Sequence, residues 1–154
     1  KHFLGIEVAR SKDGIFICLR IFVLDLLKEI GMLGSKACDT SLEPNQKLGD
    51  DYCGILVDRG SYQRLVGKLI YLSYSHSDNA VALSAVSQFM HAPHEAHLAT
   101  VMQILRYLKS FPVKVLYFSK HDHLRVEAYI DVDWAGSVID RRATSAYYTF
   151  IGGN

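Results

Sequence analysis

The eight residues from Val126 to Asp133 alternate between apolar and polar side chains without a break. A period of two is typical of a β-strand that buries one face. Asp131 and Asp133 then lie on the polar face, about 7 Å apart along the strand. A second apolar run, residues 146–151, follows and stops at Gly152-Gly153-Asn154, which has the composition of a turn. The sequence therefore predicts a short β-meander whose first strand carries two carboxylates on one face.

The rest of the chain predicts one hairpin followed by helices. Residues 3–8 and 15–19 are apolar runs joined by Asp13-Gly14, a dipeptide that suits a tight turn. Apolar residues at helical spacing then predict three helices. These stripes are Val23, Leu26, Leu27 and Ile30; Tyr62, Leu65, Val66, Leu69 and Ile70; and Leu98, Val101, Met102, Leu105 and Leu108. A fourth helix over about residues 78–90 is apolar on nearly every side and is expected at the centre of the core.

The segments between these helices carry signals of their own. Gly31 is placed to cap the end of the first helix, and Ser77 to start the helix over 78–90. Residues 35–61 are rich in turn formers and are expected to form an exposed connection.

Composition limits the class of protein. With 154 residues, 49% of them hydrophobic, the chain has the composition of a globular domain with a sizeable core. It contains no run of 18 apolar residues, so we expect no membrane association. The three cysteines share no metal-ligand spacing and suggest idle thiols in a reducing, intracellular compartment, which the sequence does not specify further. Because the chain opens on Lys1 and closes on a turn, we expect it to be a fragment.

Charge is spread unevenly along the chain. Residues 59–125 carry 8 Lys and Arg against 3 Asp and Glu, whereas residues 126–154 carry 2 against 4. A basic middle beside an acidic stretch is compatible with nucleic-acid binding, although an ordinary solvated face has the same composition.

The acidic stretch resembles the opening of the ribonuclease H domain in copia-type retrotransposon Pol polyproteins. The family pattern is roughly Tyr-x-Asp-Ala-Asp-Trp-Ala-Gly, followed by Asp-Arg-Arg-Ser-Thr-Ser-Gly-Tyr. The residues that match it are Tyr129, Asp131, Asp133, Trp134, Ala135, Gly136, Asp140, Arg141, Arg142, Thr144, Ser145 and Tyr147.

Upstream stretches resemble the same polyprotein. Residues 3–8, Phe-Leu-Gly-Ile-Glu-Val, are similar to the primer grip of its reverse transcriptase, and residues 62–72 and 106–109 match the helices that follow. The chain departs from the family at residues 75–79, where the usual sequence is Thr-Arg-Pro-Asp-Ile.

The resemblance implies an α+β fold. A leading β-hairpin is followed by about four thumb- or connection-like helices and then by the first strands of a ribonuclease H-like sheet, which is truncated. Residues 1–111 would be the C-terminal part of a reverse transcriptase, and residues 112–154 the N-terminal piece of a ribonuclease H-like domain.

The resemblance also assigns candidate site residues. Asp131 corresponds to the first carboxylate of the ribonuclease H metal site, which holds Mg²⁺ only together with partners absent from this chain, and Asp133 is a second candidate. Candidates for nucleic-acid contact are Phe3, Leu4 and Gly5, through the primer-grip resemblance, and Arg64, Lys68, Arg141 and Arg142, through their charge. Solvated surface charge remains the alternative for the four basic residues.

Neither active site of the parent family is complete in this sequence. The polymerase motif Tyr-x-Asp-Asp does not occur, and Asp131 is the one ribonuclease H carboxylate with a clear counterpart. His94 and His97, three residues apart, suit a metal only weakly, because Glu95 is the one further candidate ligand at a suitable spacing and does not complete a set of four. We therefore expect the chain alone to be inactive and to hold no cofactor.

In the intact enzyme, the resemblance implies a role in holding the RNA–DNA hybrid or template–primer duplex. Mg²⁺ would be the cofactor there, and the rest of the Pol polyprotein a partner. Two alternatives are a non-functional remnant of a transposable element and a non-enzymatic nucleic-acid-binding module.

Overall fold

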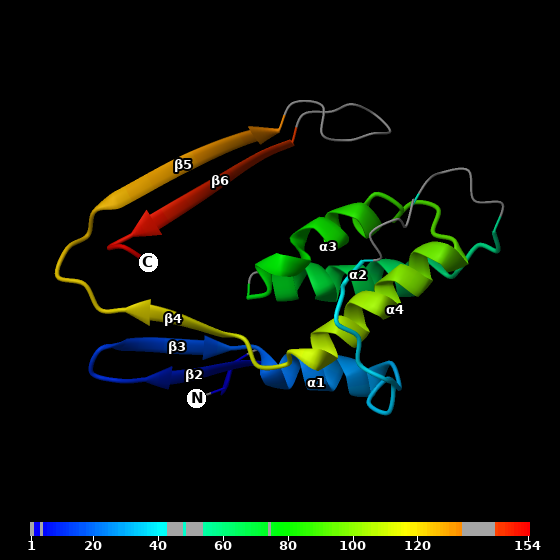
Figure 1. The fold of residues 1–154 in the computed structure, drawn as a ribbon, viewed down its shortest axis with the longest axis horizontal. Helices are drawn as coiled ribbons and strands as arrows, with labels where there is room; N and C mark the ends of the chain where they lie inside the picture. Colours follow the sequence, from blue (N-terminus) through cyan, green and yellow to red (C-terminus); the bar gives the residue numbers. More distant parts are fainter. Residues whose placement is uncertain (1, 4, 43–47, 49–53, 74, 134–143) are drawn as a thin grey trace. The chain divides into compact units, whose positions relative to one another are not determined.

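The computed structural model describes residues 2–3, 5–42, 48, 54–73, 75–133 and 144–154 (Figure 1). Within them the chain forms four α-helices and two small sheets, an α+β arrangement. It divides into two compact units. The helical unit comprises residues 1–8 and 17–116, and the strand unit comprises residues 9–16 and 117–154. None of the helices described is both long and apolar enough to cross a membrane.

Helix α1 (Arg20–Glu29) buries Val23, Leu26 and Leu27, three of the four residues in its predicted stripe. Gly31 ends the helix as predicted, with φ of +70°. The amide of Gly31 donates to the carbonyl of Lys28, and that of Met32 donates to Leu27. This pair of bonds is the Schellman arrangement, which satisfies carbonyls that the helix leaves open.

Helix α2 (Arg59–Ser73) buries Tyr62, Leu65, Val66, Leu69 and Leu72. The predicted stripe included Ile70, which is instead exposed. Leu72 replaces it because positions 62, 65, 69 and 72 follow the 3.6-residue period, whereas Ile70 lies beside that line.

Two shorter elements follow α2. A 3₁₀ turn (Ser77–Asn79) leads into α3 (Ala80–Ser87), which is shorter than the predicted helix over 78–90. Asn79, not Ser77, occupies the cap position of α3 and makes no side-chain capping bond. Helix α3 is nevertheless central to the core, since Ala82, Leu83 and Val86 are buried.

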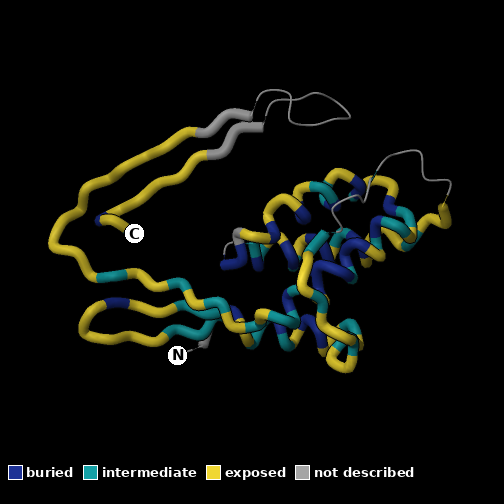
Figure 2. The backbone as a smooth tube through the Cα atoms, in the orientation of Figure 1, coloured by how far each residue is buried: buried dark blue, intermediate teal, exposed yellow. Residues whose placement is uncertain are grey.

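Helix α4 (Glu95–Ser110) closes the helical unit. It buries Val101, Leu105 and Leu108 from the predicted stripe and adds Ile104. The buried side chains of α1, α2, α3 and α4 form one hydrophobic cluster. Figure 2 marks the buried positions along the backbone of these helices in dark blue. Burial of a Leu or Val side chain contributes roughly 1.5–3 kcal/mol, so this cluster is the main source of stability in the helical unit.

Four strands form the first sheet in the order β1 (His2–Phe3), β2 (Ile6–Arg10), β3 (Gly14–Cys18) and β4 (Val115–Ser119). The predicted hairpin is therefore present, but its turn differs. The Ser11 hydroxyl accepts hydrogen bonds from the amides of Asp13 and Gly14, both at 3.1 Å. Gly14 already belongs to β3, so a side-chain-closed turn replaces the predicted tight Asp13-Gly14 turn.

The second sheet is an antiparallel pair, β5 (Val126–Asp133) and β6 (Thr144–Ile151). Its register runs from Val126 opposite Ile151 to Asp133 opposite Thr144. The predicted turn after this pair is confirmed, because Gly152 and Gly153 both adopt positive φ.

The apolar face of the second sheet is not covered by any part of the chain that the structure describes. Ile130 lies opposite Tyr147, and their side chains are 78% and 81% exposed. Val126 and Ile151, on the same face, are exposed as well. A contiguous exposed apolar face of this kind marks a surface that needs a partner.

Candidate nucleic-acid interface

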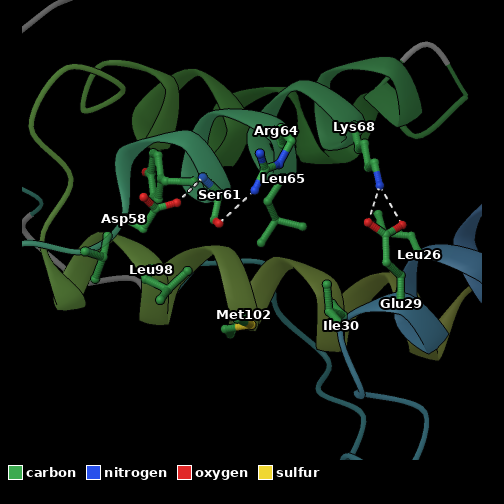
Figure 3. Close-up of a pocket in the computed structure, with 12 residues that line it drawn as sticks. Leu26, Glu29, Ile30, Asp58, Ser61, Arg64, Leu65, Lys68, Leu98 and Met102 are labelled. Carbon is green, nitrogen blue, oxygen red and sulfur yellow. Dashed lines mark hydrogen bonds and ion pairs between the residues drawn. The ribbon is translucent and has the colours of Figure 1, made fainter.

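Arg64 and Lys68, the two basic candidates on α2, line one groove of the helical unit (Figure 3). The groove has a volume of about 340 Å³ and runs between α1, α2 and α4. Its apolar lining includes Leu26, Ile30, Leu65, Leu98 and Met102. The helical spacing of Arg64 and Lys68 thus brings two cations to the edge of an apolar groove, as expected for residues four apart.

Lys68 already forms an ion pair, so it can bind a phosphate only if it leaves Glu29. Its ammonium group lies 2.5 Å from one carboxylate oxygen of Glu29 on α1 and 2.6 Å from the other. The Lys68 side chain is partly exposed and that of Glu29 is mostly exposed, so the ion pair is weak and Lys68 can exchange Glu29 for another anion.

Arg64 is held by the start of its own helix. Its guanidinium donates to the Ser61 hydroxyl at 3.0 Å, and the carboxylate of Asp58 accepts the Ser61 amide at 2.7 Å. The hydrogen bonds from Ser61, together with the charge of Arg64, lower the pKa of Asp58 below 3.8. Asp58 is therefore the N-cap of α2, a role hidden in the sequence because the residue stands in a polar loop.

Position 5 requires a glycine for two steric reasons. Its φ is +77°, and a Cβ atom there would lie 2.9 Å from Cδ2 of Phe22. Gly5 therefore lies in close contact with an aromatic ring of α1, where a larger residue would collide. Phe3 belongs to β1, but its side chain is not described, and Leu4 lies outside the described residues.

Asp131 and Asp133 lie on β5, opposite Ala146 and Thr144. Alternate positions share a face of a strand, so the register places the two on one side of the second sheet. They belong to the strand unit, whereas Arg64 and Lys68 belong to the helical unit. Arg141, Arg142 and Trp134 lie outside the described residues.

His94 and His97 serve the start of α4. The ring nitrogen Nδ1 of His97 accepts the His94 amide at 3.0 Å, and the His97 ring stacks on Phe89 with centroids 3.8 Å apart. No three potential metal ligands lie together among the side chains that the structure describes. The two histidines act as a capping pair, a reading that their spacing also permits.

A network of polar side chains around Asp78 was not foreseen from the sequence. The Tyr107 hydroxyl and the Lys114 ammonium both donate to the carboxylate, each at 2.6 Å. Partial burial acts to raise the pKa of Asp78, but the hydrogen bonds from Lys114 and Tyr107 outweigh it, so the pKa lies below 3.8. The bond to Asp78 in turn raises the pKa of Tyr107 above 10.0. Separations of 29 and 36 residues left no local signal for these contacts.

His76 stands where the resembling family has an arginine, and it is buried. Its Nδ1 atom lies 2.9 Å from the Ser75 hydroxyl, and its Nε2 atom lies 3.2 Å from the carbonyl of Phe111. The ring therefore links the end of α2 to the segment after α4. A solvent-facing charge at this position is excluded.

Comparisons with known proteins place these features in context. The chain is 38% identical over 152 residues to the retrovirus-related Pol polyprotein from transposon RE1 of Arabidopsis thaliana, which covers 98% of this chain and 10% of that polyprotein. It is 34% identical over 151 residues to the corresponding polyprotein from transposon RE2 of the same plant. It is also 33% identical over 153 residues to an uncharacterized mitochondrial protein of Arabidopsis thaliana, of which it spans 63%.

No protein-family model and no solved structure matches the chain. Two of the homologues that match nearly its whole length are nevertheless transposon Pol polyproteins. The chain spans about a tenth of the length of those polyproteins.

Proposed function

We propose that this chain is the segment of a copia-type retrotransposon Pol polyprotein that joins the end of the reverse transcriptase to the start of ribonuclease H. In the intact enzyme, residues 1–111 would help to hold the template–primer, and residues 112–154 would supply the first ribonuclease H carboxylate, Asp131. The observation that carries the proposal is the similarity over 98% of the chain to one tenth of the RE1 polyprotein.

The uncovered face of the second sheet supports the proposal. A two-stranded ribbon is marginally stable by itself and needs further strands or a covering layer. Residues that belong to a longer polyprotein leave such a face for the following segment to cover. The partner we infer for Ile130 and Tyr147 is therefore the remainder of the polyprotein.

The two carboxylates on β5, Asp131 and Asp133, are suited to form part of a Mg²⁺ site. Mg²⁺ takes one or two protein carboxylates and fills its other positions with water and phosphate oxygens. Asp131 and Asp133, two residues apart on one strand face, can supply that share. When bound, Mg²⁺ would neutralise charge on a phosphodiester and activate water for its hydrolysis. Acidic residues from the rest of the polyprotein would have to complete the set.

The test uses the intact polyprotein that carries this segment. Asp131→Asn should lower the cleavage of an RNA–DNA hybrid by at least about a hundredfold, because metal assistance contributes several kcal/mol, and should leave DNA synthesis unchanged. Asp122→Asn, in an exposed loop of the same unit, is the matched control and should cleave normally. Normal cleavage by Asp131→Asn would refute the role of this carboxylate.

A second candidate function is favoured by one observation. The mitochondrial relative is only about half as long again as this chain, which shows that the segment also occurs within a short protein. A free chain of this kind would be a nucleic-acid-binding module or a remnant without a task. The purified chain should distinguish them, since a module binds an RNA–DNA duplex with affinity that falls as salt rises, and a remnant does not bind.

A further inference from the structure

A hollow of about 380 Å³ lies within the strand unit, between the tip of the β2–β3 hairpin and the end of β4. Arg10 and Lys12 approach it from the hairpin, and Lys120 from the residue after β4. The hydroxyl side chains of Ser11 and Ser119 and the amide of Asn154 also line it. Its lining residues thus combine three cationic side chains with polar groups and include no Asp or Glu.

The frame of this hollow is fixed by short-range contacts. A Cβ atom at Gly14 would lie 2.2 Å from the carbonyl oxygen of Phe118, so only glycine allows the two strands to approach so closely. The Lys120 amide donates to the Asp13 carbonyl at 2.7 Å. This contact ties Lys120 to the hairpin tip, and the Ser11 hydroxyl closes that tip from within.

The end of β6 completes the frame. The side-chain amide of Asn154 acts as a strand backbone would, because it accepts the Ser119 amide at 2.7 Å and donates to the Ser119 carbonyl at 2.8 Å. The Gly152 amide donates to the Arg125 carbonyl at 2.8 Å. The hollow is therefore a built feature at the end of the second sheet where β5 begins.

Arg10, Lys12 and Lys120 differ from Lys68 in that they form no ion pair within the described part of the chain. Lys68, by contrast, is paired with Glu29. All three are exposed. Asp13 is a near neighbour, but its carboxylate does not line the hollow. Unpaired cations around a polar concavity attract an anion with several acceptor oxygens, and a guanidinium suits phosphate in particular.

We propose that this hollow binds the phosphodiester backbone of an RNA–DNA hybrid. The inference rests on the proposed function and adds a contact that holds the hybrid beside β5.

The test measures binding of a fluorescein-labelled hybrid of about 20 base pairs, two helical turns, to the purified chain by anisotropy. The triple variant Arg10→Gln, Lys12→Gln, Lys120→Gln should bind at least about tenfold more weakly at about 50 mM salt. The slope of log K against log salt should become shallower by about 2.7, or 0.9 for each lost phosphate contact. The matched control, Lys28→Gln, Lys36→Gln, Arg106→Gln, removes three exposed cations of the helical unit and should keep the wild-type slope.

The remaining outcomes separate this site from the proposed function. If both triple variants weaken equally, the hollow is not the site, although nucleic-acid binding by the segment stands. If the wild-type chain fails to bind at low salt, both the holding role and the hollow are refuted. If inorganic phosphate shifts the Gly14 and Ser119 amide resonances but the hybrid does not, the hollow binds free phosphate and the proposal is wrong. Circular dichroism of each variant confirms that it is folded.

Discussion

The ammonium group of Lys68 on α2 lies 2.5 Å from the carboxylate of Glu29 on α1. The pair joins two helices whose residues line the same groove. Because the side chains are 36% and 62% exposed, their contribution to stability is at most about 1 kcal/mol. The pair is more informative about binding than about folding, since Glu29 competes with any phosphate for Lys68.

Glu29→Gln should therefore tighten binding of an RNA–DNA hybrid by about twofold or more at low salt, because it releases Lys68 and removes a like charge to phosphate. Lys68→Gln should weaken binding, and both changes should leave the urea midpoint nearly unchanged. If Glu29→Gln binds as the wild type does, Lys68 is a solvated surface charge.

Gly5→Ala should destabilise the chain more than Gly31→Ala. Both glycines have positive φ, which costs an L-residue about 1–2 kcal/mol. A Cβ atom at Gly31 would meet nothing within 4 Å, whereas one at Gly5 would collide with the Phe22 ring. Overpacking should add about 1–3 kcal/mol at Gly5. Urea unfolding of the two variants measures the difference, and equal losses would show that the contact with Phe22 is easily relieved.

Tyr107→Phe should raise the pKa of Asp78 toward 3.8, because it removes a donor to the ionised carboxylate. In the folded chain this pKa is lowered, so the network stabilises the fold above about pH 4 and loses its effect as the pH falls through the folded value. An NMR titration of the Asp78 carboxyl carbon gives the shift directly. Lys114→Gln should act in the same direction, and an unchanged pKa in both variants would contradict the network.

Tyr62→Phe should cost about 1–2 kcal/mol of unfolding free energy. The buried hydroxyl donates to the Val86 carbonyl at 2.8 Å, and the change removes this buried hydrogen bond, leaving to that carbonyl only the backbone amides of Gln88 and Phe89. Burial also raises the pKa of Tyr62 to about 12. The neutral phenol of Tyr62 therefore makes its full contribution to the free energy of unfolding below about pH 10, and this contribution is lost as the pH rises through about 12. Spectrophotometric titration should show one late tyrosine that is missing in Tyr62→Phe.

Local patterns in the sequence predicted local structure well. The end of α1 at Gly31 followed from a glycine after an apolar stripe, and β5 followed from strict alternation. Ile70 was wrongly placed in the core because a run of four apolar residues, Leu69 to Leu72, leaves the helix phase ambiguous.

Contacts between distant residues had no such signal. The bonds of His76 to Phe111 and of Tyr107 to Asp78 depend on how helices pack, which periodicity does not specify. The same holds for the hollow at Lys120, because a hairpin tip and a residue more than a hundred positions later meet there. For Arg141, Arg142 and Leu4, which lie outside the described residues, contact with nucleic acid stays a prediction.

The strand unit combines residues 9–16 with residues 117–154. Within this unit, the Tyr117 hydroxyl donates a hydrogen bond to the Asp13 carbonyl, and the two residues are 104 positions apart in the sequence. During synthesis the hairpin tip must wait until the ribosome has added the whole of α1 to α4. Closing so long a loop is entropically costly, and helices that have already folded shorten it. Folded helices thus shorten the loop that the strand unit must close, so a mutation that destabilises α3 would be expected to slow assembly of the strand unit.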